Sequence, residues 1–323
     1  MCVGAVLAAL FAGEGRVDAP GSFVRAAKAA PLARPDPAAG AARAEGRTTA
    51  RGRAFKLHLA NGNDDVRQNV WVYLPSAFDP SAKKLRLVVM FHGFKNCIDS
   101  YVSDGGRICT PGGEQRTGYD VPAQVERSGT GAIVVVPQLA FDTTSSDPGK
   151  IGKIGGLKRF VKELVEEALV PAIGAHAYDD VERIMLIASS GGYQGLLPAL
   201  ANGRVEKIRD VYLLDAFYVD TSALTAFLRE RPEAFRPDAP DPRHFGLVFC
   251  RKSGTAHQSR DFGYRLGVHM NAHGDGPFYA FDGWSQKPTL DDLRVPAFVY
   301  MSRLPHDEVV SEYLWKFIAV SGI

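Results

Sequence analysis

The sequence predicts an α/β fold: a doubly wound, mostly parallel sheet with an antiparallel hairpin at its N-terminal side. Three observations predict this class: two alternating strand patterns, short continuous Val/Ile/Leu runs, and helical patterns between those runs. Continuous apolar runs suit strands that are covered on both faces, and their alternation with helices implies parallel connections. With 323 residues in the chain, one such domain over residues 54–323 is the simplest organisation.

Residues 1–53 differ from the rest in composition. The apolar run MCVGAVLAALFAG is too short to span a bilayer and resembles the core of a secretory signal without its positive segment. It is interpreted either as a truncated signal segment or as a disordered tail. Residues 14–53 are rich in Ala, Pro, Gly and Arg, which predicts a linker. A truncated signal implies export to the periplasm or the medium; otherwise the protein is expected in the cytoplasm.

The predicted hairpin comes first in the domain. Residues 54–60 (AFKLHLA) and 69–74 (NVWVYL) alternate apolar and polar side chains, as half-buried antiparallel strands do. The intervening Asn61-Gly62-Asn63-Asp64 is typical of a turn. Continuous apolar runs then predict buried strands over 86–91, 132–137, 183–188, 211–214, 246–249 and 297–301.

Helices are predicted between these strands. Residues 156–173 carry apolar side chains at three-to-four spacing, at Leu157, Phe160, Val161, Leu164 and Leu169. Further helices are predicted over 119–127, 191–201, 222–230 and 307–319. The segment DPGKIGKIGGLKRF leads into the helix predicted over 156–173 and is a basic, glycine-rich loop that could bind an anion. It lacks the spacing of a phosphate-binding loop, so a simple connection is the better interpretation.

Charge argues against a nucleic-acid partner. The net charge is +2, and residues 1–53 hold eight Arg or Lys against four acidic residues, so the remainder is slightly acidic. The domain carries no clustered basic face of the kind that binds phosphate backbones. The sequence also holds no apolar segment long enough for a stable membrane span, and it carries no indication of the oligomeric state.

Two of the four cysteines bracket a loop. Cys97 and Cys109 flank IDSYVSDGGRI, and a disulfide between them would staple a segment that has little core of its own. Two unpaired thiols are the alternative, and export would favour the bridge. A metal site is less expected, because no second close pair of Cys or His accompanies them.

The stretch IMLIASSGGYQG, residues 184–195, predicts a sharp strand-to-helix turn with a serine at its apex. In such a turn the residues two before and two after the serine must be small, because strand and helix pass close together. Ser190 has Ala188 and Gly192 at these positions, whereas Ser189 would have the branched Ile187. Ser190 is therefore the candidate nucleophile, although a simple turn is the common alternative for so short a pattern.

An earlier strand end offers the second part of a catalytic site. The run VVMFHGFKN places His92 and Gly93 after a predicted buried strand. An oxyanion hole needs two N–H groups aimed at the developing charge, and we expect them from Phe94 and Gly191. Gly93 would let the loop bend, and His92 would brace it. An ordinary turn at the strand end is the alternative.

These residues together resemble the α/β-hydrolase superfamily of serine esterases and lipases. The resemblance covers residues 54–323 and rests on HGF, ASSGG and the order of strands around them. It implies a triad in the order Ser, acid, His, and no cofactor. Asp215 follows the strand after Ser190; the superfamily more usually carries the acid one strand later, where RKSGTAHQS offers none. Asp220 and Asp261 are the reserves, and Asp215 as a helix cap is the alternative.

His306 stands where the superfamily carries its catalytic histidine, after the last strand and before the last helix. The other downstream histidines are His244, His257, His269 and His273. His257 is the second choice, and His269 and His273 could pair as metal ligands on a helix, although no third ligand stands near them. The resemblance thus implies Ser190, Asp215 and His306 as the triad.

The expected activity is hydrolysis of a small or moderately sized carboxylic ester, one on a carbohydrate included. The short segment after Asp215 leaves little room for a large lid, and Lys95–Tyr119 could wall the site. Aromatic side chains expected along it are Tyr101, Phe141, Tyr193, Phe217 and Tyr218. A serine peptidase, amidase or acyltransferase would use the same triad, and a non-catalytic binding module of this fold is the alternative from another class.

Overall fold

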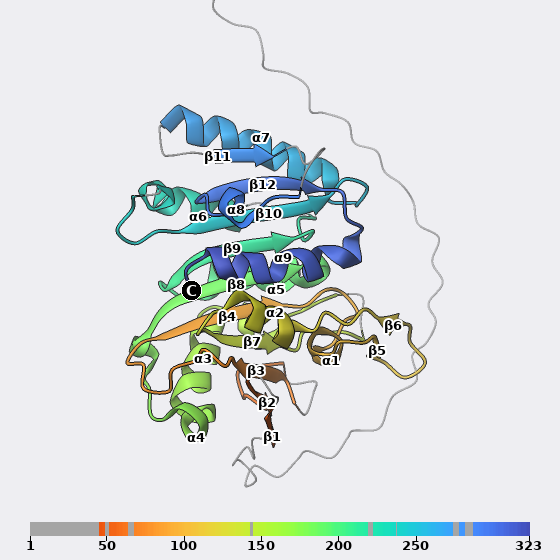
Figure 1. Ribbon diagram of the computed structural model, residues 1–323, viewed down its shortest axis with the longest axis vertical. Helices are drawn as coiled ribbons and strands as arrows, with labels where there is room; N and C mark the ends of the chain where they lie inside the picture. Colours follow the sequence, from red (N-terminus) through yellow and green to blue (C-terminus); the bar gives the residue numbers. More distant parts are fainter. Residues whose placement is uncertain are drawn as a thin grey trace, which may run out of the picture. The chain divides into compact units, whose positions relative to one another are not determined.

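The computed structural model describes residues 45–48, 52–63, 68–142, 145–218, 222–236, 238–273, 278–281 and 287–323. Its strands form one sheet in the order β1-β2-β3-β7-β4-β8-β9-β10-β12-β11 (Figure 1). The strands are β1 (Glu45–Thr48), β2 (Arg53–Leu57), β3 (Val70–Leu74), β4 (Leu85–Phe91), β7 (Ile133–Pro137), β8 (Val181–Ser189), β9 (Ile208–Leu214), β10 (His244–Cys250), β11 (Phe278–Phe281) and β12 (Ala297–Ser302). A separate small ribbon pairs β5 (Arg107–Ile108) with β6 (Gln115–Arg116).

The sheet is mostly parallel with an antiparallel N-terminal side, as predicted. The pairs β1–β2, β2–β3 and β3–β7 are antiparallel, and all pairs from β7 to β11 are parallel. The prediction that both hairpin strands are half-buried is wrong for β3, in which every residue is buried. The alternate side chains of β3 enter the apolar clusters on the two opposite faces of the sheet, so both of its faces are covered.

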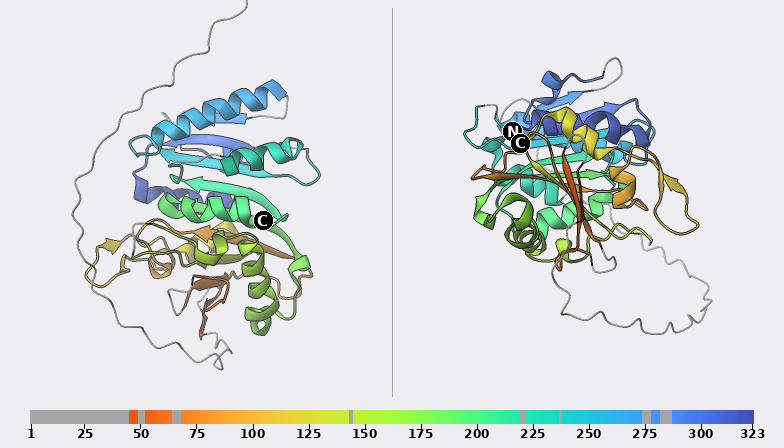
Figure 2. Two further views of the ribbon diagram at one scale, coloured as in Figure 1. Left: turned by 180° about the vertical axis from the view of Figure 1, so that it is seen from behind. Right: turned by 60° about the horizontal axis from the view of Figure 1, so that its bottom comes forward.

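Helices cover both faces of the sheet (Figures 1 and 2). One apolar cluster joins the sheet to α3 (Gly156–Glu163), α5 (Tyr193–Asn202), α6 (Ser222–Glu230) and α7 (Ala256–His273). A second cluster joins the other face to α1 (Ile98–Val102), α2 (Val121–Ser128), α8 (Leu290–Leu293) and α9 (His306–Val320). Alternate residues of one strand serve the two clusters, since side chains of a strand point to opposite faces.

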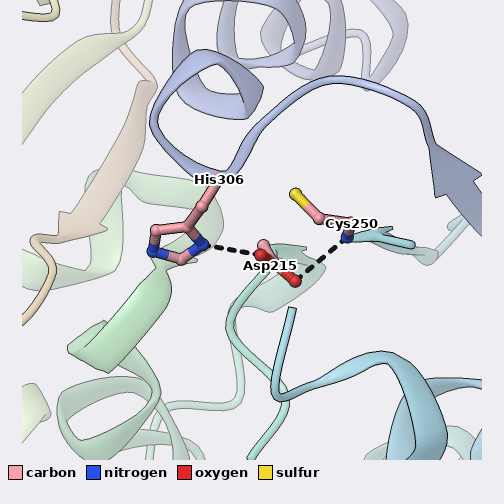
Figure 3. A group of neighbouring side chains, drawn as sticks. All are labelled: Asp215, Cys250 and His306. Carbon is pink, nitrogen blue, oxygen red and sulfur yellow. Dashed lines mark hydrogen bonds and ion pairs between the residues drawn. The ribbon is translucent and has the colours of Figure 1, made fainter. Parts of the chain in front are cut away.

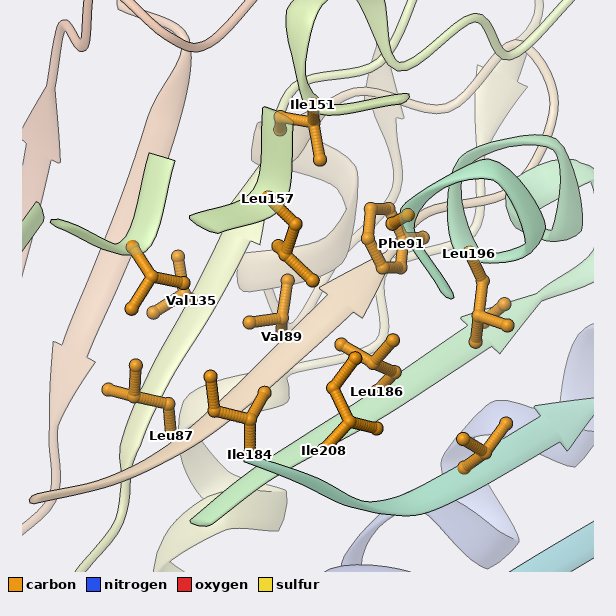
Figure 4. Packing of buried hydrophobic residues seen from close by; sticks show 14 of the residues in the cluster. Leu87, Val89, Phe91, Val135, Ile151, Leu157, Ile184, Leu186, Leu196 and Ile208 are labelled. Atoms are coloured by element: carbon orange, nitrogen blue, oxygen red, sulfur yellow. The ribbon is translucent and has the colours of Figure 1, made fainter. Parts of the chain in front are cut away.

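The first cluster holds the central strands in place. Leu87, Val89 and Phe91 of β4 pack with Ile184 and Leu186 of β8 under the helices α3 and α5 (Figure 4). Each of these side chains is fully buried. Because burial of one such side chain contributes about 1.5–3 kcal/mol, this packing fixes where β4 and β8 end. The ends of these two strands carry the predicted oxyanion loop and the predicted serine.

The predicted helix over 156–173 is interrupted. After α3 the chain forms a wider π turn over Leu164–Ala168, and α4 (Val170–Ile173) follows. Pro171 stands in the first turn of α4 and has no N–H to continue the earlier helical hydrogen bonds. In the described part of the chain, no helix combines the length and the apolar character needed to cross a membrane.

The residues predicted as a linker contribute to the sheet. β1 pairs along the edge of β2, with Glu45 opposite Lys56 and Thr48 opposite Arg53. Such pairing uses backbone groups and requires no large apolar side chain, which is why composition gave no sign of it. The remainder of residues 1–53, apart from Gly52, lies outside the described residues, as does Asp64 of the predicted turn.

Candidate active site

The chain turns sharply between β8 and α5. Ser189 is still extended, with φ −119° and ψ 140°, whereas Ser190 has φ 48° and opens a 3-10 turn over Ser190–Gly192. A non-glycine residue in this left-handed region stores strain, which is common at functional sites. A Cβ at Gly192 would lie 2.2 Å from the Phe91 carbonyl oxygen, so glycine is required there. Ala188 is paired with Phe91 of β4 and is fully buried in the first apolar cluster.

The two adjacent serines have different surroundings. Ser189 is 1% exposed, and its hydroxyl is hydrogen-bonded to the hydroxyl of Tyr101. The Tyr101 oxygen also accepts a hydrogen bond of 2.8 Å from the Gly93 N–H. Ser190 is partly exposed and is hydrogen-bonded to the hydroxyl of Tyr218. The structure therefore leaves Ser190 as the accessible serine and uses Ser189 to tie the turn to the Gly93 loop.

Asp215 and His306 are brought together from distant parts of the chain. Asp215 follows β9 with φ 48°, and His306 begins α9 after β12. His306 Nδ1 lies 2.6 Å from Asp215 Oδ2 (Figure 3). Strands β8, β9 and β12 are parallel to one another within the sheet, so their carboxyl ends bring Ser190, Asp215 and His306 to the same edge.

The other carboxylate oxygen of Asp215 is held by the loop after β10. Asp215 Oδ1 accepts hydrogen bonds from the Cys250 N–H at 3.1 Å, from Ser253 Oγ at 2.9 Å and from Thr255 Oγ1. Asp215 itself is fully buried. A buried carboxylate is tolerated only when such hydrogen bonds replace its water shell. The carboxylate is thus fixed in orientation toward His306.

These contacts determine the charges of the pair. Burial alone would raise the pKa of Asp215, but hydrogen bonds from His306, Thr255 and Cys250 lower it on balance. The hydrogen bond to Asp215 raises the pKa of His306, against the opposing effect of burial. Asp215 is therefore ionised at neutral pH and orients Nδ1–H toward itself, which leaves Nε2 of His306 free to take a proton.

The Cys250 thiol lies beside this pair. Donor atoms of Asp215, Cys250 and His306 lie within 4.8 Å of one another, so the three could together hold a metal ion. Burial and the neighbouring Asp215 raise the pKa of Cys250 well above its ordinary value, so that the thiol stays protonated. A metal-binding cysteine acts as the thiolate, and Nδ1 of His306 already bonds Asp215. The arrangement fits a hydrogen-bonded acid–base pair better than a metal centre.

The loop after β4 forms the other side of the site. His92 is fully buried; its Nδ1 donates to the Gly93 carbonyl oxygen at 3.0 Å, and its Nε2 accepts from the Leu139 N–H at 2.8 Å and from Gln138 Nε2 at 2.8 Å. Burial lowers the pKa of His92 to about 4, against the effect of the Gly93 bond. The ring is therefore neutral and joins two loops.

Phe94 and Gly191 meet beside Ser190. A Cβ added at Gly191 would lie 2.8 Å from the backbone nitrogen of Phe94, and one added at Gly93 would lie 3.1 Å from Ser190 Cβ. Neither glycine has a positive φ, so each is required for close approach of the backbone. The two predicted N–H donors are thus carried by neighbouring backbone segments.

The other predicted residues lie apart from this constellation. His244 pairs with Asp210 at 2.8 Å, at the start of β10, away from the carboxyl ends of the strands. His257 and Asp261 form an exposed pair with each other on α7. Asp220 and the side chains of His269 and His273 lie outside what the structure describes.

The structure also describes the cysteine pair, the aromatic side chains expected along the site and the glycine-rich loop. Cys97 and Cys109 form a disulfide. Tyr101 and Phe217 are buried in the core, whereas Tyr193 and Tyr218 stack with ring centres 5.4 Å apart. In the loop before α3, the Gly155 and Gly156 N–H groups donate to the carbonyl oxygens of Asn202 and Lys153, which supports a connection rather than an anion site.

Sequence reasoning missed the residues that hold the Asp215 carboxylate in place. The segment RKSGTAHQS holds no carboxylate of its own, yet its Ser253 and Thr255 hold the carboxylate of Asp215 from the neighbouring strand. The signal available was a pair of hydroxyl residues at the carboxyl end of a strand beside that of Asp215. Tyr101 and Gln138 gave no such signal, because their roles depend on contacts between separate loops.

A pocket of about 410 Å³ lies beside the loop that follows β4. Its lining includes Lys95, directly after Phe94, and Phe141, together with Cys109 and Thr110 of the stapled loop. Charged groups of both signs face it, because Glu114, Arg116 and Asp142 also line it. Such a polar wall suits a hydrated ligand better than an acyl chain.

Comparisons with known proteins give similar folds. No protein-family model and no curated protein match the chain. Among solved structures, an S-formylglutathione hydrolase from Agrobacterium tumefaciens is 13% identical, with TM-score 0.45 and coverage of 85% of this chain and 97% of that one. A glucuronoyl esterase from Solibacter usitatus is 13% identical, with TM-score 0.43 and coverage of 90% and 87%. A cold-adapted esterase from an Arctic intertidal metagenomic library is 10% identical, with TM-score 0.41 and coverage of 86% and 99%.

At these identities and TM-scores, the substrates of the neighbours do not carry over to this chain. Its own strand order, with parallel strands on both sides of β8 and the turn at Ser190 after it, defines the architecture. The described chain has the α/β-hydrolase fold that its sequence predicts.

Proposed function

We propose that this protein is a serine hydrolase that cleaves a carboxylic ester through an acyl-enzyme on Ser190. The observation that carries the proposal is the hydrogen bond of 2.6 Å between His306 Nδ1 and Asp215 Oδ2, at the sheet edge where Ser190 turns out of β8. A buried aspartate that orients a histidine, at the sheet edge that also carries a strained and accessible serine, is the arrangement expected to activate a hydroxyl. No cofactor enters the chemistry.

Acylation follows from the placement of charge. His306 Nε2 takes the proton of Ser190 as its Oγ attacks the ester carbonyl, and Asp215 stabilises the imidazolium that forms. The carbonyl oxygen becomes an oxyanion that accepts hydrogen bonds from the N–H groups of Phe94 and Gly191. His306 then gives its proton to the leaving alkoxide, and the alcohol departs.

Deacylation repeats these steps with water. His306 takes a proton from water as the water oxygen attacks the acyl carbon on Ser190, and the second oxyanion uses the same N–H groups. The tetrahedral intermediate collapses, the proton returns to Ser190 Oγ, and the acid is released. Removal of one oxyanion donor typically costs about 3–4 kcal/mol of transition-state stabilisation, so these backbone groups carry much of the rate.

The substrate class is inferred from the pocket beside the oxyanion loop. Its wall carries Lys95 and Arg116 as well as Glu114 and Asp142, and its volume of about 410 Å³ suits a moderately sized group. Polar groups of both signs favour a hydroxyl-rich part of the substrate, as in a carbohydrate ester, over a long alkyl chain. Activity restricted to emulsified long-chain lipids would contradict this assignment.

Covalent labelling with a fluorophosphonate probe tests the nucleophile. Wild type should bind one probe molecule on the peptide that contains Ser190, and Ser190→Ala should bind none while its circular dichroism spectrum stays unchanged. Ser189→Ala is the matched control, because it removes the neighbouring hydroxyl and should still be labelled at Ser190. Folded wild type without label would contradict the proposal and favour a binding module.

A panel of acyl esters and matched amides then separates the hydrolase classes. Turnover of esters with little turnover of the matched amides supports esterase activity. Preferential cleavage of amides would indicate a peptidase or amidase, and transfer of the acyl group to an added alcohol in preference to water would indicate an acyltransferase.

A further inference from the structure

Ser146 carries a hydroxyl that the fold does not use. It lies in the segment between β7 and the 3-10 turn Gly149–Gly152, and its side chain is fully buried. Among the described residues, its Oγ has no hydrogen-bond partner. Because leaving a buried hydroxyl unpaired costs stability, such a group in a native protein calls for an explanation.

The position of Ser146 is fixed by the helix that begins at the active-site turn. The Ser146 N–H donates to Gln194 Oε1 of α5 at 2.5 Å. The flanking chain is held as well, since the Ala140 N–H donates to the Asp147 carbonyl oxygen at 3.0 Å. The backbone of Ser146 is therefore tied to the helix that follows the Ser190 turn, while its hydroxyl can still rotate.

The Ser146 hydroxyl lies close to the backbone segments that carry the two candidate oxyanion donors. One point, the position that a Cβ of Gly191 would take, lies 3.0 Å from Ser146 Oγ and 2.8 Å from the Phe94 nitrogen. The hydroxyl and this backbone donor thus stand on the same side of the Gly191 Cα. Since Gly191 has no positive φ, glycine is needed there for space and not for its backbone conformation. Any larger residue would collide with both groups.

We propose that Ser146 is a third oxyanion donor: its Oγ–H donates a hydrogen bond to the acyl oxygen of the ester as negative charge develops there. The inference rests on the proposed function. Phe94 and Gly191 offer fixed N–H groups, whereas Ser146 offers a hydroxyl that rotates toward the charge. A donor that stays unpaired in the free enzyme and becomes paired in the transition state lowers the barrier without tightening ground-state binding.

Ser146→Ala tests the role with p-nitrophenyl acetate as substrate. We expect kcat to fall about 100-fold with KM nearly unchanged, and the rate constant of fluorophosphonate labelling to fall in step, since the phosphoryl oxygen uses the same donors. The melting temperature should stay equal or rise, because the variant removes an unpaired polar group. Ser146→Thr keeps the hydroxyl and should recover most of kcat.

Ser321→Ala is the matched control for loss of a buried serine. Ser321 is 3% exposed near the end of the chain, and its hydroxyl donates to the Ile318 carbonyl oxygen at 2.9 Å. This variant should lose stability and keep kcat, which is the reverse of the pattern expected for Ser146→Ala.

Three results would overturn the inference. A Ser146→Ala enzyme with wild-type kcat and labelling rate would show that the hydroxyl does not contact the oxyanion, while the proposed function would stand. A raised KM with unchanged kcat would show that its contact is equally strong in the ground state and the transition state, and therefore is not reserved for the developing charge. A folded wild type that neither hydrolyses the ester nor reacts with the probe would remove the proposed function and this inference together.

Discussion

The two sides of Ser190 differ in how their polar groups are satisfied. On the acid–base side, Asp215 binds His306 through one oxygen and accepts from Cys250, Ser253 and Thr255 through the other. On the oxyanion side, the brace His92 is fully bonded, but Ser146 Oγ has no partner among the described residues. Internal hydrogen bonds surround the Asp215 carboxylate, whereas the Ser146 hydroxyl makes none within the described part of the chain.

This difference follows from the proposed chemical role of each side. A carboxylate that must stay ionised when buried requires several donors, which also fix its direction. An oxyanion hole must leave its donors for a charge that exists only during the reaction. A group that positions another side chain is therefore expected to have all of its hydrogen bonds inside the protein. A group that stabilises the oxyanion is expected to keep its donor for the reacting atoms.

Asp215→Asn breaks the acid–base side and should have the largest effect of the variants considered below. We expect kcat to fall about 10⁴-fold, because the amide no longer stabilises the imidazolium or fixes its tautomer. In wild type the acid limb of kcat/KM should lie above pH 6.5, since Asp215 raises the pKa of His306 and protonated His306 cannot act as base. In the variant this limb should move to lower pH.

Asp307→Asn is the control for that profile. Asp307 raises the pKa of His306 through charge alone, without a hydrogen bond, so its removal should shift the limb slightly and leave kcat near wild type. Equal pH profiles in wild type and Asp215→Asn would contradict the assigned pair.

His92→Gln tests the brace on the oxyanion side. The pKa of His92 in the folded protein is lowered to about 4, whereas the unfolded chain binds a proton near pH 6.5. As pH falls from 6.5 to 4 the unfolded state gains a proton that the folded state does not, so wild type should lose about 3 kcal/mol of unfolding free energy. The variant should lack this part of the loss.

Urea unfolding at pH 7 and pH 4 measures this difference. His257→Gln, which changes an exposed histidine on α7, should keep the wild-type loss. If His92→Gln lost as much stability as wild type over that interval, His92 would not be the buried neutral group described here.

Thr255→Val removes one donor to Asp215 and should have the smallest effect of the three main variants, Asp215→Asn, His92→Gln and Thr255→Val. Asp215 would lose one donor and keep those from His306, Ser253 and Cys250. A hydrogen bond to a charged group contributes about 1.5 kcal/mol, so we expect kcat to fall about tenfold. Thr255→Ser retains the hydroxyl and should restore activity in the same p-nitrophenyl acetate assay; a fully active Thr255→Val would mean that the donors are redundant.

Much of the fold could be predicted because its central strands are continuous apolar runs. The predicted strand over 86–91 agrees with β4 (Leu85–Phe91), and the helix over 222–230 matches α6. The strand over 211–214 is longer in the structure, as β9 begins at Ile208. Its early residues include the charged Arg209 and Asp210. Asp210 is buried because Arg183 of β8 binds it at 2.7 Å and His244 of β10 at 2.8 Å, contacts that no local pattern reveals.

The unpredicted elements depend on tertiary packing. α7 has no clear apolar face in its sequence, yet Phe262 and Leu266 are buried in the first apolar cluster. β11 is a short strand that pairs with β12 at the edge of the sheet. In both cases the neighbouring strands supply the stability that local propensity does not.

The candidate site was predictable where a residue type and a strand end coincide. Ser190, Asp215 and His306 each follow a predicted strand, and the order of the three along the chain narrowed the choice. Ser146 and Thr255 could not be found in this way, because hydroxyl residues are common in loops. Their roles depend on which loops the sheet brings together.

The central claim is that Ser190 carries the acyl group. The most direct test mixes the enzyme with p-nitrophenyl acetate, quenches it in acid within the first turnover, and locates the acetyl group by intact mass and peptide mapping. We expect one acetyl group on Ser190 and none in Ser190→Ala. Acetyl on Ser189 or elsewhere, or steady turnover with no acetylated protein, would contradict it.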